Sequence, residues 1–265
     1  MEALHLKPFA YKRSNDGHPS LQPHAYMARE LINCTVGSFR DISDNDLTSQ
    51  QRLAKRRFIR LFEHQLRRDT ADLHKTNLYA TLEELMRHLD EFFFFGSVRP
   101  LVRKFQLTHF PPGCPMLGNC VEVDHEDGPP RFDISLNNQI QGQLAGLSEL
   151  VNTLLHEMTH VFLNTFVCRC SRCLRNDFNA VGVTTSGHGP TFRGLNYAAM
   201  VCLGGWNEDL DRVAKARSNN TYIDQVSLDL ETRSREITMQ NCAFDPTRVL
   251  SFVQHPSHNH LIWTH

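Results

Sequence analysis

The sequence predicts an α+β fold organised around one strongly apolar helix. Three observations lead to this fold class. Two helical patterns come first, and a group of short strand patterns follows them. A third, strongly apolar helical pattern then contains H-E-x-x-H. Segregated helices and strands in this order indicate a small antiparallel or mixed sheet packed on the last helix, rather than a regular βα alternation.

The overall composition is that of an ordinary globular protein. The chain has 265 residues, 40% of them hydrophobic and 22% charged, with a formal net charge of -1. This length suits one domain with extensions, and the balanced charge gives no global attraction to nucleic acid or membranes. No apolar run approaches the ~18 residues of a membrane span, so no membrane partner is expected.

The first twenty residues have no continuous apolar core, which argues against a secretory signal. We therefore expect an intracellular protein, in the nucleus or cytoplasm. In that environment the eight cysteines are expected to be thiols or metal ligands rather than disulfides.

Residues 1–48 contain scattered Pro, Gly, Asn and Ser and are expected to form a loosely ordered arm, with a short helix around Tyr26 to Ile32. Residues 49–75 are then expected to contain a basic amphipathic helix. The basic side chains at its centre are Arg52, Lys55, Arg56, Arg57 and Arg60. Such a face could lie along the phosphate backbone of DNA; the alternative is a solvated helix face paired with acidic neighbours elsewhere in the fold.

A second helix is expected from Asn77 to Phe93, ended by Gly96. The aromatic run Phe92 to Phe95 is interpreted as core. Three strands are expected after it: Val102 to Leu107, Cys120 to Val123 and Phe132 to Leu136.

The segment from Val151 to Phe166 combines helical periodicity with His156, Glu157 and His160. Residues four apart on a helix project from nearly the same face, so the two imidazoles could grip one zinc ion. Glu157 would lie beside them, where it could take a proton from the attacking water. The alternative is a chance match to a short pattern within an ordinary buried helix.

A catalytic zinc site needs a third protein ligand. His188 is the candidate, because it lies between two glycines just before a helical stretch from Pro190 to Cys202. The separation from His160 is 188 − 160 = 28 residues, which excludes the closely spaced third histidine of metzincins.

These motifs together resemble the SprT-like metalloproteases. HEMTH followed by GHGPTF carries the likeness, and LDEFFFFGSV and RFDISLNN extend it upstream, so that it covers roughly residues 76–203. The resemblance implies a zincin-like fold and a peptidase that acts on proteins, often proteins bound to DNA. It also implies that His156, His160 and His188 are the zinc ligands and that Glu157 is the catalytic residue.

Residues 167–187 look like an insertion relative to that family, and they carry Cys168, Cys170 and Cys173. These three could hold a second, structural zinc, with a fourth ligand from Cys120, Cys202 or Cys242. A disulfide within the insertion, or three unrelated surface thiols, are the alternatives.

The predicted function is therefore that of a zinc-dependent endopeptidase with protein substrates. The alternative is a non-catalytic, zinc-stabilised module that binds nucleic acid or protein. Residues 204–265 form a C-terminal extension to which the sequence assigns no role; the zinc ribbon that usually follows the protease domain in this family is not evident there.

Overall fold

The computed structural model of the chain describes residues 21–68, 70–111, 114, 116–123, 128–171, 173 and 188–219. Within them the fold is mixed α+β, as predicted. The helices are α1 (Ala28–Gly37), α2 (Ser49–Leu66), α3 (Thr70–Thr76), α4 (Leu78–Phe93), the 3-10 turn η1 (Arg99–Leu101), α5 (Leu147–Phe166), α8 (Pro190–Gly204) and α9 (Glu208–Asn219). The strands are β1 (Val102–Thr108), β2 (Gly118–Val123), β3 (Arg131–Asn137), β4 (Gln139–Ile140) and β5 (Gln143–Leu144).

The main sheet is small and mixed, and it consists of the three predicted strands. Its order is β1-β3-β2, with β1 parallel and β2 antiparallel to the central β3. In β3 the side chains of Phe132, Ile134 and Leu136 are fully buried, at alternating positions. Because successive strand residues face opposite sides, these three form one apolar face, and α5 contacts β2 and β3.

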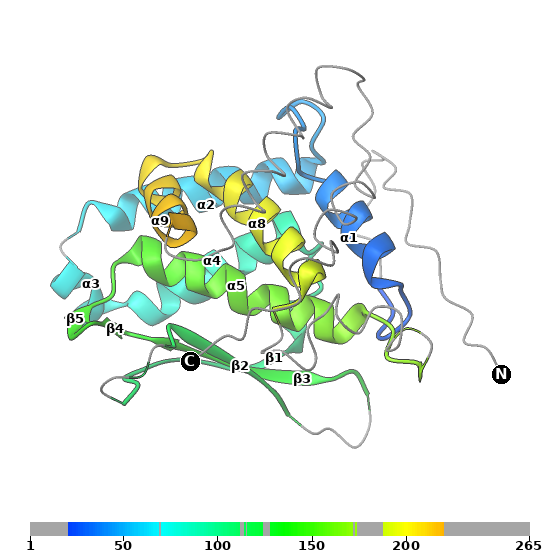
Figure 1. Cartoon of the computed structure of the whole chain (residues 1–265). Helices are drawn as coiled ribbons and strands as arrows, with labels where there is room; N and C mark the ends of the chain where they lie inside the picture. The colour runs from blue at the N-terminus through cyan, green and yellow to red at the C-terminus, as the bar shows by residue number, and fades with distance from the viewer. Residues whose placement is uncertain are drawn as a thin grey trace.

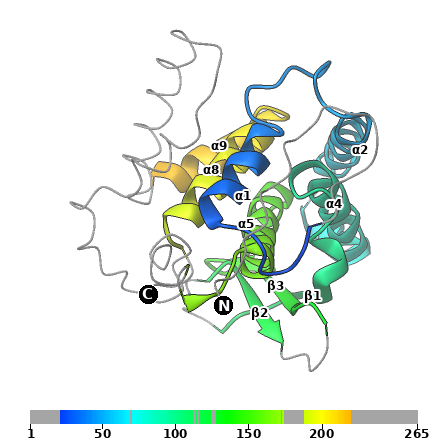
Figure 2. The ribbon, with the colours of Figure 1, turned by 90° about the vertical axis from the view of Figure 1, so that its right-hand side faces the viewer.

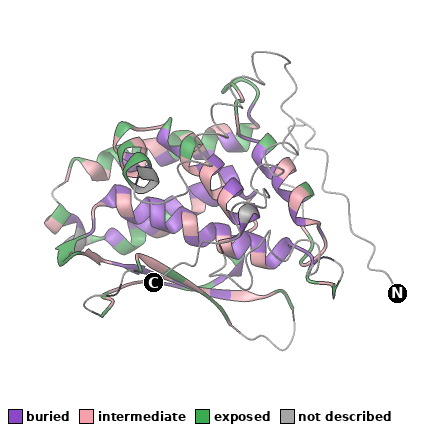
Figure 3. Ribbon diagram, in the orientation of Figure 1, coloured by how far each residue is buried: buried purple, intermediate pink, exposed green. Residues whose placement is uncertain are grey.

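Helix α5 lies at the centre of the molecule. Figure 1 shows the sheet along one side of α5, with α8 and α9 on the other side. Figure 2, seen along α5, shows α2 and α4 to one side of it and α1, α8 and α9 to the other. The burial colours of Figure 3 agree, because α5 is almost wholly buried between these layers.

The aromatic run is core, as the sequence predicted: Phe92, Phe93, Phe94 and Phe95 are all at most 3% exposed. Trp206, which follows α8, joins the run to the other helices. Its ring centroid lies 4.6 Å from that of Phe92 and 5.3 Å from that of Phe58 of α2. The resulting aromatic cluster connects α2, α4 and the end of α8.

The expected loose arm does not extend to residue 48. From Ala28 the chain forms α1, in which Leu31, Ile32 and Val36 are buried. Apolar residues at i, i+1 and i+5 give α1 a face that packs on α8. A short helix was expected around Tyr26 to Ile32; α1 begins two residues later and continues to Gly37, and its burial was not predicted. Residues 1–20 lie outside the described ranges.

The predicted basic helix is confirmed as α2 and begins with a capping box. Thr48 Oγ1 accepts a hydrogen bond from the Gln51 backbone N–H (3.1 Å), and Gln51 Oε1 accepts one from the Thr48 backbone N–H (3.2 Å). The same buried side chain donates from Nε2 to the carbonyls of Ser38 and Phe92. Gln51 therefore ties the residue after α1 and the last turn of α4 to the start of α2.

A two-stranded hairpin, β4–β5, was not predicted. It turns at Gln141 and Gly142, whose φ angles are 52° and 80°. Two consecutive residues with positive φ are typical of a tight hairpin turn. The hairpin leads directly into α5.

Among the described helices, none is both long and apolar enough to cross a membrane. Most of the C-terminal extension, from residue 220 onward, lies outside the described ranges.

Candidate metal centre

Two of the three candidate ligands come from consecutive turns of α5. The helix begins after Gly146, whose backbone N–H donates to Oε2 of Glu149 (2.8 Å). Nearly all side chains of α5 are buried, and the helix packs against both the sheet and α8. His156 and His160 are half-buried on one face of it.

The third candidate, His188, lies just before α8. Gly189 is the N-cap of that helix and Pro190 its first residue, where the missing N–H of proline costs no hydrogen bond. The His188 carbonyl accepts a hydrogen bond from Nε of Arg193 (2.7 Å). The first turn of α8 therefore holds the backbone of His188 in place.

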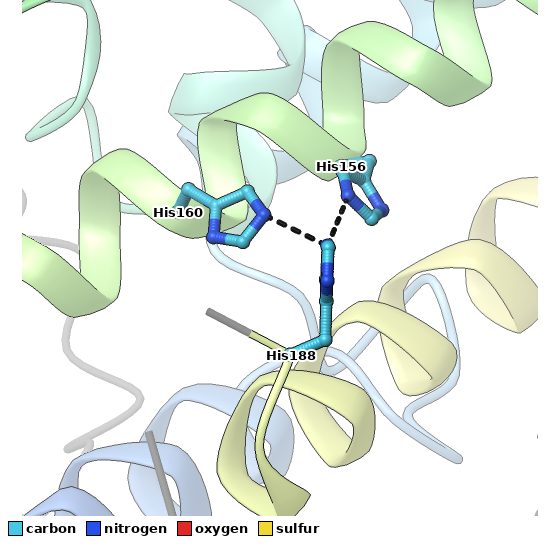
Figure 4. A group of neighbouring side chains, drawn as sticks. All are labelled: His156, His160 and His188. Atoms are coloured by element: carbon cyan, nitrogen blue, oxygen red, sulfur yellow. Dashed lines mark hydrogen bonds between the residues drawn. The ribbon is translucent and has the colours of Figure 1, made fainter. Parts of the chain in front are cut away.

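The three histidines converge on one point, as the sequence predicted (Figure 4). Nε2 of His188 lies 2.9 Å from Nε2 of His156 and 3.1 Å from Nε2 of His160. Tetrahedral ligands ~2.05 Å from a zinc ion would lie about 3.3 Å apart. Both separations from His188 are thus close to the spacing that a metal of this size requires.

Phe192 forms an apolar floor under the three histidines. Its ring is stacked on that of His160, with centroids 4.1 Å apart and planes at 22°. The rings of His156 and His188 each lie 4.8 Å from it, and Phe192 is only 2% exposed. Sequence reasoning gave Phe192 no role, although its place four residues after His188 at the start of a helix was a usable signal.

The electrostatics of the site favour neutral imidazoles. Burial, and then the neighbouring His188, lower the pKa of His160 to about 3. Burial, and then the Arg193 guanidinium, lower the pKa of His188 to about 4. Neutral imidazole is the form that binds metal ions.

Glu157 is 5% exposed and lies against β2. A Cβ atom on Gly118 would be 2.5 Å from Oε1 of Glu157 and 2.7 Å from Cγ2 of Thr153. A glycine at this position therefore lets the edge strand approach the helix closely enough to cover the carboxylate. No local pattern in the sequence indicates this contact, because it joins residues of two different elements.

The structure also brings the three cysteines of the insertion together. The sulfur atoms of Cys168, Cys170 and Cys173 lie within 4.8 Å of one another, and within the described residues none of them forms a disulfide. Burial raises the pKa of Cys173 to about 12.

Of the fourth ligands considered from the sequence, the two that the structure describes lie outside this cysteine group. Cys120, on β2, is not part of it. Cys202 is also outside it and lies beside the Phe39 carbonyl. Cys242 lies outside the described residues.

The basic face of α2 is divided in two. Lys55 forms an ion pair with Asp44 (2.7 Å), and Arg52 donates to the carbonyls of Asp44 and Asn45, so these two brace the preceding loop. Arg56, Arg57 and Arg60 are exposed. Of the five basic residues at the centre of α2, only these three have exposed side chains that could contact nucleic acid.

Comparisons of the chain with protein-family models, with curated proteins and with solved structures found no match.

Proposed function

We propose that this chain is a zinc-dependent endopeptidase with a zincin-like fold, related to the SprT-like metalloproteases. One observation carries the proposal: the Nε2 atoms of three histidines, two on α5 and one just before α8, converge. Glu157 directly follows the first of these histidines on α5. Three histidines leave a fourth position for water or substrate, as catalytic zinc sites do. A purely structural zinc site is usually closed by four protein ligands.

The donor set suits zinc, because imidazole is a favoured ligand of this ion and the Nε2 separations fit its size. Zinc in this centre would lower the pKa of a water molecule toward ~7 and polarise the carbonyl of the peptide bond. Glu157 would act as the general base, taking a proton from the attacking water and passing it to the leaving amine. Phe192 and Gly118 would keep the ligands and this base in place.

The arrangement of the elements supports the family assignment. Within GHGPTF, residues 188–192 run from the third histidine into α8, and residues 131–137 of RFDISLNN form the central strand β3. The resemblance further suggests protein substrates, including proteins associated with DNA.

Metal removal tests the proposed chemistry. The full chain, freed of metal with a chelator and dialysed, is expected to lose its ability to cleave an unfolded protein substrate. Stoichiometric zinc should restore cleavage, and magnesium should not, because Mg²⁺ prefers oxygen ligands. The release of new amino termini measures the rate. If the zinc-reconstituted chain releases none, the non-catalytic binding module becomes the better account.

A second candidate function, nucleic-acid binding, rests on the exposed Arg56, Arg57 and Arg60 of α2. If these arginines contact phosphates, their joint substitution by alanine should weaken binding to double-stranded DNA. It should also reduce the slope of log affinity against log salt by up to about 0.9 for each lost contact. Lys104→Ala, which removes an exposed basic side chain from β1, is the control. Equal salt slopes for the parent and the triple variant would remove α2 from the account.

A further inference from the structure

A second cluster of metal-ligand side chains lies directly after α5. Cys168 follows Val167, the C-cap residue of α5, and Cys170 and Cys173 complete C-x-C-x-x-C. Cys168 and Cys173 are buried, at 6% and 3% exposure, and Cys170 is half-buried. Their sulfur atoms all lie within 4.8 Å of one another. Thiolates bound to one tetrahedral zinc at ~2.3 Å would be about 3.8 Å apart.

The backbone of this segment turns around the sulfur atoms. The N–H of Cys170 points at Sγ of Cys168 (3.4 Å), and the N–H of Cys173 points at Sγ of Cys170 (3.5 Å). These contacts fix the positions of two of the three sulfur atoms relative to the backbone. Two such contacts in six residues indicate a preorganised site rather than thiols that happen to be neighbours.

The cluster is anchored to three parts of the fold. The backbone N–H of Cys168 donates to the Tyr26 carbonyl (2.7 Å), next to the β-bridge between Tyr26 and Val167. Arg169 forms two hydrogen bonds to the Glu122 carboxylate of β2 (3.1 and 2.7 Å) and one to the Asn164 carbonyl of α5 (2.9 Å). The N-terminal segment, the edge strand and the exit of α5 therefore meet at these cysteines.

We propose that Cys168, Cys170 and Cys173 supply three ligands of a second metal ion, a thiophilic divalent cation of the zinc class, whose fourth ligand is not among the described cysteines. Three thiolates select such an ion over magnesium or calcium, which prefer oxygen ligands. The ion would fix the exit of α5 to the N-terminal segment and to β2. This site is separate from the three histidines and does not depend on the peptidase activity proposed above.

Metal stoichiometry and cobalt spectroscopy on the full chain test this proposal. The parent protein is expected to hold two zinc ions. The triple variant Cys168→Ser/Cys170→Ser/Cys173→Ser is expected to hold one, and so is His156→Ala/His160→Ala. Cys34→Ser, a half-buried cysteine on α1, should keep both. A parent protein with a single ion that the triple serine variant retains would overturn the proposal.

Cobalt gives a readout that needs no cysteine substitution, in case the triple variant does not fold. In His156→Ala/His160→Ala reconstituted with Co²⁺, cysteine ligation should produce an intense thiolate-to-cobalt charge-transfer band in the near ultraviolet. Cys170→Ser in the same background should weaken that band, whereas Cys170→His, which restores a ligand, should retain bound cobalt. Absence of the band in the histidine variant, or a disulfide found among the three cysteines by thiol titration, would contradict the proposal.

Discussion

At the scale of single residues, the most demanding contact is that between Glu157 and Gly118. As the proposed base, Glu157 would need to lie near the candidate metal centre and to be shielded from bulk water. The edge strand supplies the shield, and it fits because residue 118 has no side chain. The backbone of Gly118 is strand-like, so its role is close approach rather than an unusual φ angle.

Gly118→Ala is therefore expected to displace the Glu157 carboxylate and to slow peptide-bond cleavage by about 10- to 100-fold. A shift of about 1 Å in a catalytic group can cost on this order. Zinc content should be unchanged, because the histidines are not touched. The control is Gly37→Ala, whose added Cβ meets nothing within 4 Å. Parent-like cleavage by Gly118→Ala would show that the close approach has no catalytic consequence.

The sequence predicted the site residues that lie close together along the chain, and missed those that reach the site only through packing between distant elements. His156 and His160 follow from helical spacing, and their convergence is confirmed. His188 could be proposed only from its glycine-flanked position and the family resemblance. Gly118 and Phe192 were missed because their roles depend on how β2 and α8 pack against α5, which no short pattern encodes.

At the scale of elements, the connection between α4 and β1 is fixed by one buried carboxyl group. Asp90, in the last turn of α4, accepts hydrogen bonds from the backbone N–H groups of Val98 (2.9 Å) and Arg99 (2.7 Å). It thereby aligns the start of β1 with the end of α4. Burial raises the pKa of Asp90 to about 7, although both N–H donors and the nearby Arg99 act to lower it, and Glu91 adds to the rise.

A raised pKa in the folded state means that folded Asp90 holds a proton that the unfolded chain, with a pKa of ~3.9, has already released. The free energy of unfolding should therefore fall as pH rises from about 4 to 7, by up to ~1.4 kcal/mol per pH unit from this group, and then level off. Asp90→Asn should lack this component. Urea unfolding of parent and variant between about pH 5 and 8 measures the difference. A constant difference across that range would mean that Asp90 stays ionised in the folded protein.

Most elements could be predicted because their signals are local. Helical periodicity predicted α2, α4, α5 and α8, and alternation predicted β1. The sequence did not predict how α1 is buried. Its surroundings are rich in Pro and Gly, and its apolar face is buried only by packing against α8, which is distant in the sequence. The two-residue strands β4 and β5 are too short for any periodicity to be detected.

At the scale of the whole molecule, α5 organises both candidate metal sites. Its middle turns carry His156, Glu157 and His160, and the cysteine cluster begins two residues after its last turn. The sheet contacts one side of α5. Helix α8, which follows the third histidine, contacts the other side of α5. The catalytic proposal thus depends on a helix whose position is set by core packing, and the proposed second metal ion would secure the end of that helix.

The substitution Glu157→Gln tests the central claim most directly, because it removes the proposed base and preserves its size. Cleavage of an unfolded protein substrate, followed as new amino termini, should fall by at least about 100-fold, the lower range of general acid–base contributions. The zinc content of the variant should equal that of the parent protein, which separates loss of the base from loss of the metal. If Glu157→Gln cleaves the substrate at the parental rate with its zinc in place, Glu157 is not the base and the proposed mechanism is wrong.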